Sequence, residues 1–278
     1  MKITIRNMEL PELEIATYLA YKEGWNPGIA DGLAFYQQDP CGFFLAEIDG
    51  RVVGCISAVK YSDNYGFIGF YVVDEEYRNS PAGTLLARKA LKYLQGYNIG
   101  IDGVLSRVSN YERIGFRYAH NNARYEGIGG KYNYSQNIVL AATIPVNEIC
   151  DYDRLCFPAL RTKFIDAWIN LPNSKTFCYV EKNKLMGYGT IRQCRKGYKI
   201  GPLFADNEII ANELFKALSG IAVDELIYLD VSLINKVAVK LADRYEMKKV
   251  FETIRMYTIS QPDIQMEKVF GITSFELG

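Results

Sequence analysis

A short stretch in the first half of the chain combines an arginine, a turn and small residues just before a helical pattern. It reads Arg78-Asn79-Ser80-Pro81-Ala82-Gly83-Thr84 and follows an apolar, strand-like run at 67–73. A helix start presents free backbone N–H groups and the positive end of the helix dipole, and both favour a phosphate. Arg78 adds a fixed positive charge, and Gly83 allows a ligand to approach the backbone closely. The pattern therefore predicts a phosphate-binding strand–loop–helix.

The sequence contains too few histidines for most histidine-based sites. The chain has one histidine, His120, so a multi-histidine metal site is excluded and no metal is expected. A Ser-His-Asp or Cys-His arrangement would have to use this residue. His120 follows Phe116-Arg117-Tyr118-Ala119 and is interpreted as a strand-end or loop residue. Acid–base work then falls to Tyr, Asp, Glu or Cys.

The bulk properties describe two domains without a strongly charged partner. A length of 278 residues favours two domains over one. The formal net charge of zero argues against nucleic acid or an anionic membrane as the main partner. No apolar run approaches the roughly 20 residues that span a bilayer, and the N-terminus lacks the apolar core of a signal peptide. The six cysteines show no Cys-x-x-Cys spacing, so reduced thiols and a cytoplasmic location are expected.

The two halves repeat one order of elements. In the first half, strands are predicted at 3–6, 42–47, 52–60, 66–73, 100–105 and 116–125, with helices at 11–23, 32–38 and 81–95. In the second half, strands are predicted at 137–143, 176–181, 185–193, 198–204, 225–231 and 249–257, with helices at 158–168, 207–219 and 235–245. Antiparallel strands that feed a helix and a further strand indicate an α/β class with an α+β mixed sheet. The glycine-rich stretch at 127–130 is a plausible joint, which gives domains 1–130 and 131–278; residues from Gln261 onward carry little signal.

The strand–loop–helix resembles the cofactor motif of the GCN5-related N-acetyltransferases. In that family a loop of pattern Arg/Gln-x-x-Gly-x-Gly/Ala wraps the pyrophosphate of acetyl-CoA. Arg78 and Gly83 match its first and last positions, while Pro81 replaces the middle glycine and removes one N–H donor. The resemblance implies acetyl-CoA as co-substrate. The residues expected to contact it are Tyr71, Val72, Val73, Arg78, Asn79, Ser80, Ala82, Gly83, Thr84 and Asn110.

A second motif resembles the family's late motif, in which a tyrosine lies four residues before Gly-Phe. It reads Asn110-Tyr111-Glu112-Arg113-Ile114-Gly115-Phe116. The resemblance implies that Tyr111 protonates the departing CoA thiolate, which suits a phenol of pKa about 10. Asp102 is the first choice for the base that deprotonates the substrate, with Glu23 and Glu76 as alternatives. Trp25, together with Asn26 and Glu23, is expected beside the acceptor.

Nearly the full chain further resembles a bacterial subfamily of two-domain acetyltransferases. The matching stretches include Glu23-Gly24-Trp25-Asn26-Pro27-Gly28 in the first half and Tyr198-Lys199-Ile200-Gly201-Pro202-Leu203-Phe204 in the second. These imply tandem GNAT-like folds with a diverged C-terminal copy. In that copy Ala205-Asp206-Asn207-Glu208 replaces the phosphate loop, and its negative charge opposes a pyrophosphate. The second copy is therefore predicted not to bind CoA.

The expected function is an N-acetyltransferase that moves an acetyl group from acetyl-CoA to a primary amine by direct attack. A small-molecule acceptor is favoured, without nucleic-acid or membrane partners and as a monomer or homodimer. Two alternatives stay open: a non-catalytic CoA-binding or ligand-sensing protein, and a peptide or protein acetyltransferase. Neither the identity of the acceptor nor the length of the acyl chain follows from these residues.

Overall fold

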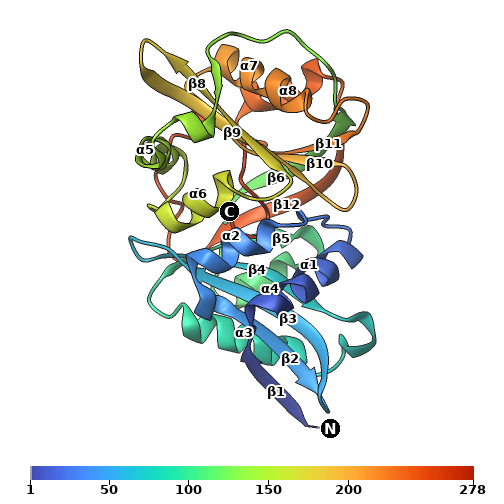
Figure 1. Ribbon diagram of the computed structural model, residues 1–278. Coiled ribbons are helices and arrows are strands. Elements are labelled where there is room, and N and C mark those ends of the chain that lie inside the picture. The colour runs from blue at the N-terminus through green and yellow to red at the C-terminus, as the bar shows by residue number, and fades with distance from the viewer. Residues whose placement is uncertain (1) are drawn as a thin grey trace.

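The computed structural model describes residues 2–278, which form two stacked units joined by one continuous mixed sheet (Figure 1). The sheet has 13 strands, in the order β1-β2-β3-β4-β5-β12-β6-β11-β10-β9-β8-β7, and β13 pairs with β10. The strands are β1 (Ile3–Asn7), β2 (Phe43–Ile48), β3 (Arg51–Lys60), β4 (Tyr65–Val73), β5 (Asn98–Val104), β6 (Arg117–Ile128), β7 (Ile138–Leu140), β8 (Ser174–Glu181), β9 (Lys184–Gln193), β10 (Tyr198–Ala205), β11 (Leu226–Ser232), β12 (Lys248–Tyr257) and β13 (Val269–Gly271). The helices are α1 (Leu13–Lys22), α2 (Asp31–Gln38), α3 (Ala82–Tyr93), α4 (Val108–Arg113), α5 (Val146–Cys156), α6 (Thr162–Ile169), α7 (Glu208–Ser219) and α8 (Lys236–Arg244). This architecture confirms the predicted α/β class with a mixed sheet.

Helices cover both faces of the first half's strands. Helix α3 buries Ala82, Leu86 and Ala90, which recur every four residues, against β2 and β3. Helices α1 and α2 pack on the opposite face, where Phe35 of α2 is fully buried. The sheet is therefore enclosed on both sides, and only its strand ends and loops remain for a ligand.

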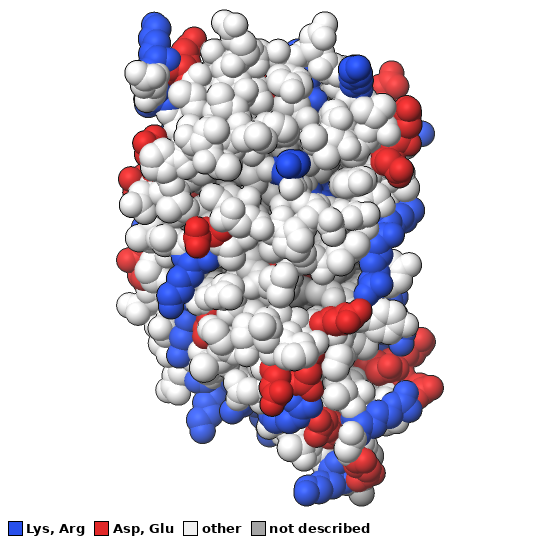
Figure 2. Space-filling view, viewed as in Figure 1, with Lys and Arg blue, Asp and Glu red and all other residues white. Residues whose placement is uncertain are grey.

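The two halves are joined by an aromatic contact as well as by the sheet. Phe35 of α2 stacks on Trp168 and Phe164 of α6, with ring centroids 5.8 and 6.2 Å apart. All three side chains are completely buried, and they belong to one hydrophobic core that runs through both halves. Figure 2 shows few charged side chains over the middle of this face, where the halves meet. The halves therefore share one hydrophobic core at this contact.

The strands at the centre of the sheet are exchanged between the halves. Strand β12, near the end of the chain, pairs with β5 of the first half, so that Arg255 lies opposite Asp102. Strand β6, the last strand expected for the first half, pairs instead with β11 of the second half and with β12. Gly127 and Ile128 of the expected joint lie inside β6, opposite Ile227 and Leu226. The domain boundary at 130 stays a prediction. In the structure it falls two residues after the end of β6, a strand of the continuous sheet.

Most predicted elements are confirmed, but two stretches differ. The predicted helix at 158–168 starts later, at Thr162, and it is preceded by α5, which the sequence did not indicate. Phe157, the C-cap of α5, has an extended backbone conformation, which ends α5 before α6 begins. The stretch from Gln261, where the sequence carries little signal, contains β13 and ends in buried residues.

Several properties bear on the kind of site this fold holds. Within residues 2–278, no helix combines the length and apolar character needed to cross a membrane. The same residues contain no group of three or more His, Cys, Asp or Glu side chains that would hold a metal ion. All six cysteines are free thiols; five are buried and Cys41 is exposed.

Candidate active site

The candidate site begins where β4 and β5 part. The two strands pair in parallel only from Tyr65–Asn98 to Ile68–Ile101. Beyond that point β4 continues to Val73, paired only with β3 on its other side. Phe70 has φ +44°, a left-handed conformation that marks an irregularity in the strand. Backbone groups of β4 on the β5 side therefore lack a strand partner, and they can bind an extended ligand.

Helix α3 starts at the edge of this opening with uncommitted donors. Leu85 N–H bonds to the Pro81 carbonyl, whereas the N–H groups of Gly83 and Thr84 have no partner within residues 2–278. Ser80 Oγ donates to the Tyr77 carbonyl at 2.7 Å and lies 3.3 Å from the Ala82 nitrogen. This confirms the predicted helix start, with free N–H groups where an anion would bind.

Tyr71 and Arg78 fasten the end of β4 to this helix start. The Tyr71 hydroxyl donates to the Gly83 carbonyl at 2.9 Å. Arg78 Nε donates to the Val73 carbonyl at 3.2 Å, and its Nη2 pairs with Glu23. The structure therefore brings Glu23, which was expected beside the acceptor, to the loop of Arg78, where it pairs with the guanidinium that was predicted to bind the pyrophosphate.

Tyr111 lies across the opening, beside the end of β5. Its ring packs on Gly103, where an added Cβ would lie 2.4 Å from the Tyr111 Cε2 atom. Burial raises the pKa of Tyr111, and the neighbouring Tyr71 adds to this shift. A hydrogen bond from the Val104 backbone and the charge of Arg107 act in the opposite direction. The phenol is therefore protonated at neutral pH, as a proton donor must be. Asn110 on the same helix accepts from Arg113.

Asp102, the first choice for the base, occupies a structural position. Arg255 of β12 donates to both of its carboxylate oxygens, at 2.8 and 2.6 Å, and Asn122 donates at 2.8 Å. The Asp102 side chain is fully buried; burial raises its pKa, and Arg255 opposes the shift. A carboxylate engaged by three donors has little capacity left for a substrate proton, so this geometry argues against the base role. Of the alternatives, Glu76 is exposed and pairs with Arg51 at 3.7 Å.

The loop that carries Trp25 docks on the second half. The Asn26 amide donates to the Lys196 carbonyl at 2.8 Å and accepts from the Lys196 N–H at 3.2 Å. The Trp25 carbonyl accepts from Arg124 and from Lys199, and its side chain packs against the core that joins the halves. Asn26 therefore holds the interface, and its role beside the acceptor stays a prediction, as does that of Trp25.

The single histidine lies in the interior of β6, not at a strand end or in a loop. It pairs with Arg255 across the ladder, is 3% exposed, and lines a cavity of about 30 Å³ beside Arg255 and Thr273. Burial lowers the pKa of His120 to about 3, and the charge of Arg255 adds to this. The His120 side chain is therefore neutral in the folded protein at neutral pH.

This depressed pKa predicts an acid-sensitive fold. Below the ordinary histidine pKa of about 6.5 the unfolded chain binds a proton that the folded chain excludes, so stability falls as pH drops from about 6.5 towards 3. Urea titrations of the wild type and His120→Gln across this window should show a steeper acid loss for the wild type. Equal pH dependence in the two proteins would contradict the assignment.

The equivalent opening in the second half is closed. Strands β10 and β11 pair in parallel only over Tyr198–Ile200 and then part, as β4 and β5 do. Strand β13 fills the gap by pairing with β10 at Leu203 and Phe204, and Ile272 N–H bonds to the Asp230 carbonyl of β11 at 2.8 Å. Asn207 accepts from the first N–H groups of α7, at 3.0 and 3.1 Å. In the second half, β13 therefore occupies the gap between the parted strands, and Asn207 caps the helix start.

A splayed mixed sheet with an open helix start beside it defines the class of acyl-CoA N-acyltransferase folds. Residues 8–116 match the family model "Acetyltransferase (GNAT) family", and residues 149–271 match "Acetyltransferase (GNAT) domain". The chain belongs to the GNAT family as a tandem protein with two such units, and it is an acyltransferase. The family uses acyl-CoA.

The chain is similar to relatives along its whole length. It is 26% identical over 277 residues to the holothin acyltransferase of Pseudoalteromonas sp. (strain SANK 73390), covering 99% of this chain and 94% of that protein. A putative acetyltransferase from Pyrococcus horikoshii superposes with a TM-score of 0.85 at 20% identity, covering 99% of this chain and 96% of that one. A tandem GNAT protein from the clavulanic acid biosynthesis pathway gives a TM-score of 0.64 at 12% identity, covering 94% and 100% of the two chains. The two structures show a shared fold.

Proposed function

We propose that the chain transfers an acetyl group from acetyl-CoA to the primary amine of a small molecule, using the site in its first half. The observation that carries this is the start of α3 beside the end of β4, where, within residues 2–278, the N–H groups of Gly83 and Thr84 have no partner. A pyrophosphate at the helix start would direct the rest of the cofactor along the unpaired edge of β4. Tyr111 then lies on the far side of the opening, where the sulfur would leave.

The reaction needs one nucleophilic attack and three proton transfers. The acceptor ammonium loses a proton to a base, and the free amine forms a C–N bond to the thioester carbonyl carbon. A backbone N–H of β4 can stabilise the oxyanion as it forms. The C–S bond then breaks. Tyr111 gives its proton to the departing thiolate and regains one from the nitrogen, which loses its second proton, so that the products are a neutral amide and CoA.

Two observations favour an active enzyme with a small acceptor over the alternatives. The relative that matches 99% of this chain is named as a holothin acyltransferase, which supports turnover over ligand sensing alone. The face of β4 that carries Phe67 and Phe70 is covered by α1, α2 and core residues of the second half. Such an enclosed face favours a small molecule over the lysine of a folded protein.

The second copy is proposed to stabilise the first without binding CoA. Strand β13 fills its opening and Asn207 caps α7. Isothermal titration should therefore give one acetyl-CoA per chain. A stoichiometry of two would contradict this division of roles.

The proposed function is tested by following free thiol release from acetyl-CoA with a panel of primary amines. Release above the hydrolysis rate for at least one amine, with acetylated product by mass spectrometry, is the expected result. Acetyl-CoA should also raise the melting temperature by mass action. Binding without any release would support the ligand-sensing alternative, and no rise in melting temperature would exclude both CoA-based functions.

Pro81 should limit cofactor affinity, because it supplies no N–H at the helix start. Pro81→Gly restores a donor aimed at the phosphate, and a hydrogen bond to a charged group is worth about 1.5–3 kcal/mol. We expect acetyl-CoA to bind about 10-fold more tightly by titration calorimetry. Pro145→Gly, at the start of α5, makes the same change away from the site and should leave affinity unchanged. Equal affinity of Pro81→Gly and wild type would show that the proline costs nothing.

A further inference from the structure

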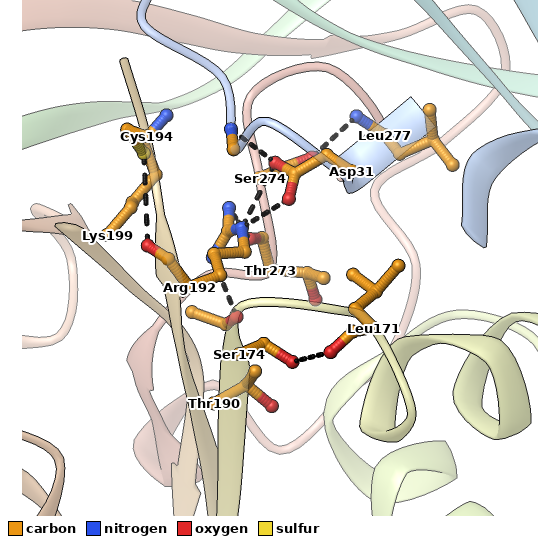
Figure 3. Close-up of polar contacts among 12 residues, drawn as sticks. Asp31, Leu171, Ser174, Thr190, Arg192, Cys194, Lys199, Thr273, Ser274 and Leu277 are labelled. Atoms are coloured by element: carbon orange, nitrogen blue, oxygen red, sulfur yellow. Dashed lines mark hydrogen bonds and ion pairs between the residues drawn. The ribbon is translucent and has the colours of Figure 1, made fainter. Parts of the chain in front are cut away.

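Buried charges gather where the two halves meet, and nearly all of them are paired. Four arginines contact a buried aspartate there: Arg124 with Asp230, Arg161 with Asp153, Arg192 with Asp31 and Arg255 with Asp102, at 2.6–2.8 Å. In each pair the two side chains are at most 8% exposed. Figure 3 shows the Arg192–Asp31 pair beside Thr273 and Leu277. Pairing of this kind offsets the cost of removing charges from water.

Two buried charged side chains stand apart from this pattern. Glu276 is 2% exposed, and within residues 2–278 neither of its carboxylate oxygens has a hydrogen-bond partner. Lys199 is 1% exposed, and its Nζ reaches only the Trp25 carbonyl, at 3.4 Å. Burial and the charge of Arg124 lower the pKa of Lys199, while Glu276 and Asp230 oppose this, so Glu276 lies within electrostatic reach without an ion pair. An unpaired buried carboxylate costs stability, and such a cost is commonly retained for function.

The backbone of Glu276 lies against β4 at the candidate active site. An added Cβ on Gly69 of β4 would lie 1.8 Å from the Glu276 carbonyl oxygen, so the two backbones are in contact. Gly69 is the first β4 residue beyond the pairing with β5, and the irregular Phe70 follows it. Phe275 and Leu277, which flank Glu276, pack in the core on the face that carries α1 and α2. Glu276 therefore approaches β4 from this face.

The segment that carries Glu276 is held in place by its own hydrogen bonds. Leu277 N–H bonds to Ser274 Oγ and Gly278 N–H to the Ser274 carbonyl, both at 3.0 Å. The Tyr61 hydroxyl of the first half donates to the Leu277 carbonyl at 3.3 Å. The backbone on both sides of Glu276 is thus fixed, while among the described residues its carboxylate oxygens have no hydrogen-bond partner.

On the basis of the proposed function, we propose that Glu276 is the catalytic base that takes the proton of the acceptor amine. The carboxylate accepts one proton from the acceptor R–NH₃⁺, and the neutral amine then forms the C–N bond to the thioester carbon. The C–S bond breaks, the thiolate takes its proton from Tyr111, and the second proton lost by the nitrogen returns Tyr111 to its neutral form. Glu276 afterwards returns its proton to solvent. The acceptor class is an alkylamine that arrives as an ammonium ion. The charged groups that face Glu276 are Lys199 of β10 and Arg124 of β6, with Asp230 of β11 behind Arg124.

The test is the isosteric change Glu276→Gln, compared with Glu267→Gln. Glu267 belongs to the same C-terminal region but is exposed. Glu276→Gln should lower kcat with an alkylamine such as benzylamine about 100-fold at neutral pH, as expected for loss of a general base. Its melting temperature should stay close to the wild type, because glutamine keeps the shape of the side chain and, within residues 2–278, the carboxylate oxygens have no hydrogen bond to lose. Glu267→Gln should change neither quantity.

The dependence of activity on pH and on the amine distinguishes a catalytic role of Glu276 from a structural one. Activity of Glu276→Gln should rise with pH as the free amine becomes available, and an arylamine that is neutral at neutral pH should lose far less activity than benzylamine. A lower melting temperature for Glu276→Gln, unchanged turnover or higher turnover would each overturn the assignment. If no amine reacts even with the wild type, the melting temperature of Glu276→Gln still decides whether the charge is unpaired. A wild type that acetyl-CoA does not stabilise would mark the failure of the proposed function instead.

Discussion

Replacing Tyr111 by phenylalanine should lower the turnover of acetyl transfer about 100-fold, a typical contribution of a single proton donor. The ring packs on Gly103, and phenylalanine keeps that contact because it lacks only the hydroxyl. Acetyl-CoA affinity should be unchanged, because the proposed phosphate donors lie on α3 and not on α4. Assays of thiol release measure the turnover, and titration calorimetry measures the affinity for acetyl-CoA.

The matched control is Tyr118→Phe, which removes the hydroxyl of a tyrosine that is 59% exposed on β6. It should retain wild-type turnover and melting temperature. In the wild type, activity should also fall at alkaline pH as the Tyr111 phenol ionises, and burial places that fall above the pH expected for a free phenol. Full turnover of Tyr111→Phe would remove this residue from the mechanism, and loss of acetyl-CoA binding would assign it to the cofactor site.

The cofactor half of the site could be predicted because its signals are local. The strand, the loop from Arg78 to Gly83 and the start of α3 follow one another along the chain, and neighbouring residues dictate each of them. Tyr111 could be singled out as a candidate for the same reason, since its spacing to Gly115 and Phe116 is short. Such motifs depend on backbone geometry within a few residues and not on distant partners.

The polar interior could not be predicted, because its partners are far apart in the sequence. Asp102 is 153 residues from Arg255, and the two meet only because β12 takes the place beside β5. The pairing of Asp102 with Arg255 and the exchange of strands therefore have one cause, a long-range strand pairing that local periodicity does not encode.

Replacing Arg192 by methionine should destabilise the protein by about 3–5 kcal/mol, the usual cost of breaking a buried ion pair from one side. Arg192 of β9 donates through Nε to both oxygens of Asp31 on α2, at 2.8 and 3.0 Å. Its Nη atoms reach the carbonyls of Gly201 and Thr273, at 2.9 and 3.0 Å. The change therefore leaves a buried carboxylate and two carbonyls without their donor. Chemical denaturation, with thermal melts alongside, measures the loss.

The control is Arg51→Met, because Arg51 pairs with Glu76 at 3.7 Å and both side chains are more than 60% exposed. An exposed pair of this kind contributes about 0–1 kcal/mol, so this variant should be close to wild type. The double variant Asp31→Asn, Arg192→Met should lose less stability than the sum of its single changes, because the neutral amide no longer needs the guanidinium. In the Asp31→Asn variant the amide oxygen can still accept from the Gly28 N–H, as the Asp31 carboxylate does at 2.8 Å. Additive losses would show that Arg192 acts through its carbonyl contacts to β10 and Thr273, and that the ion pair does not join the two halves.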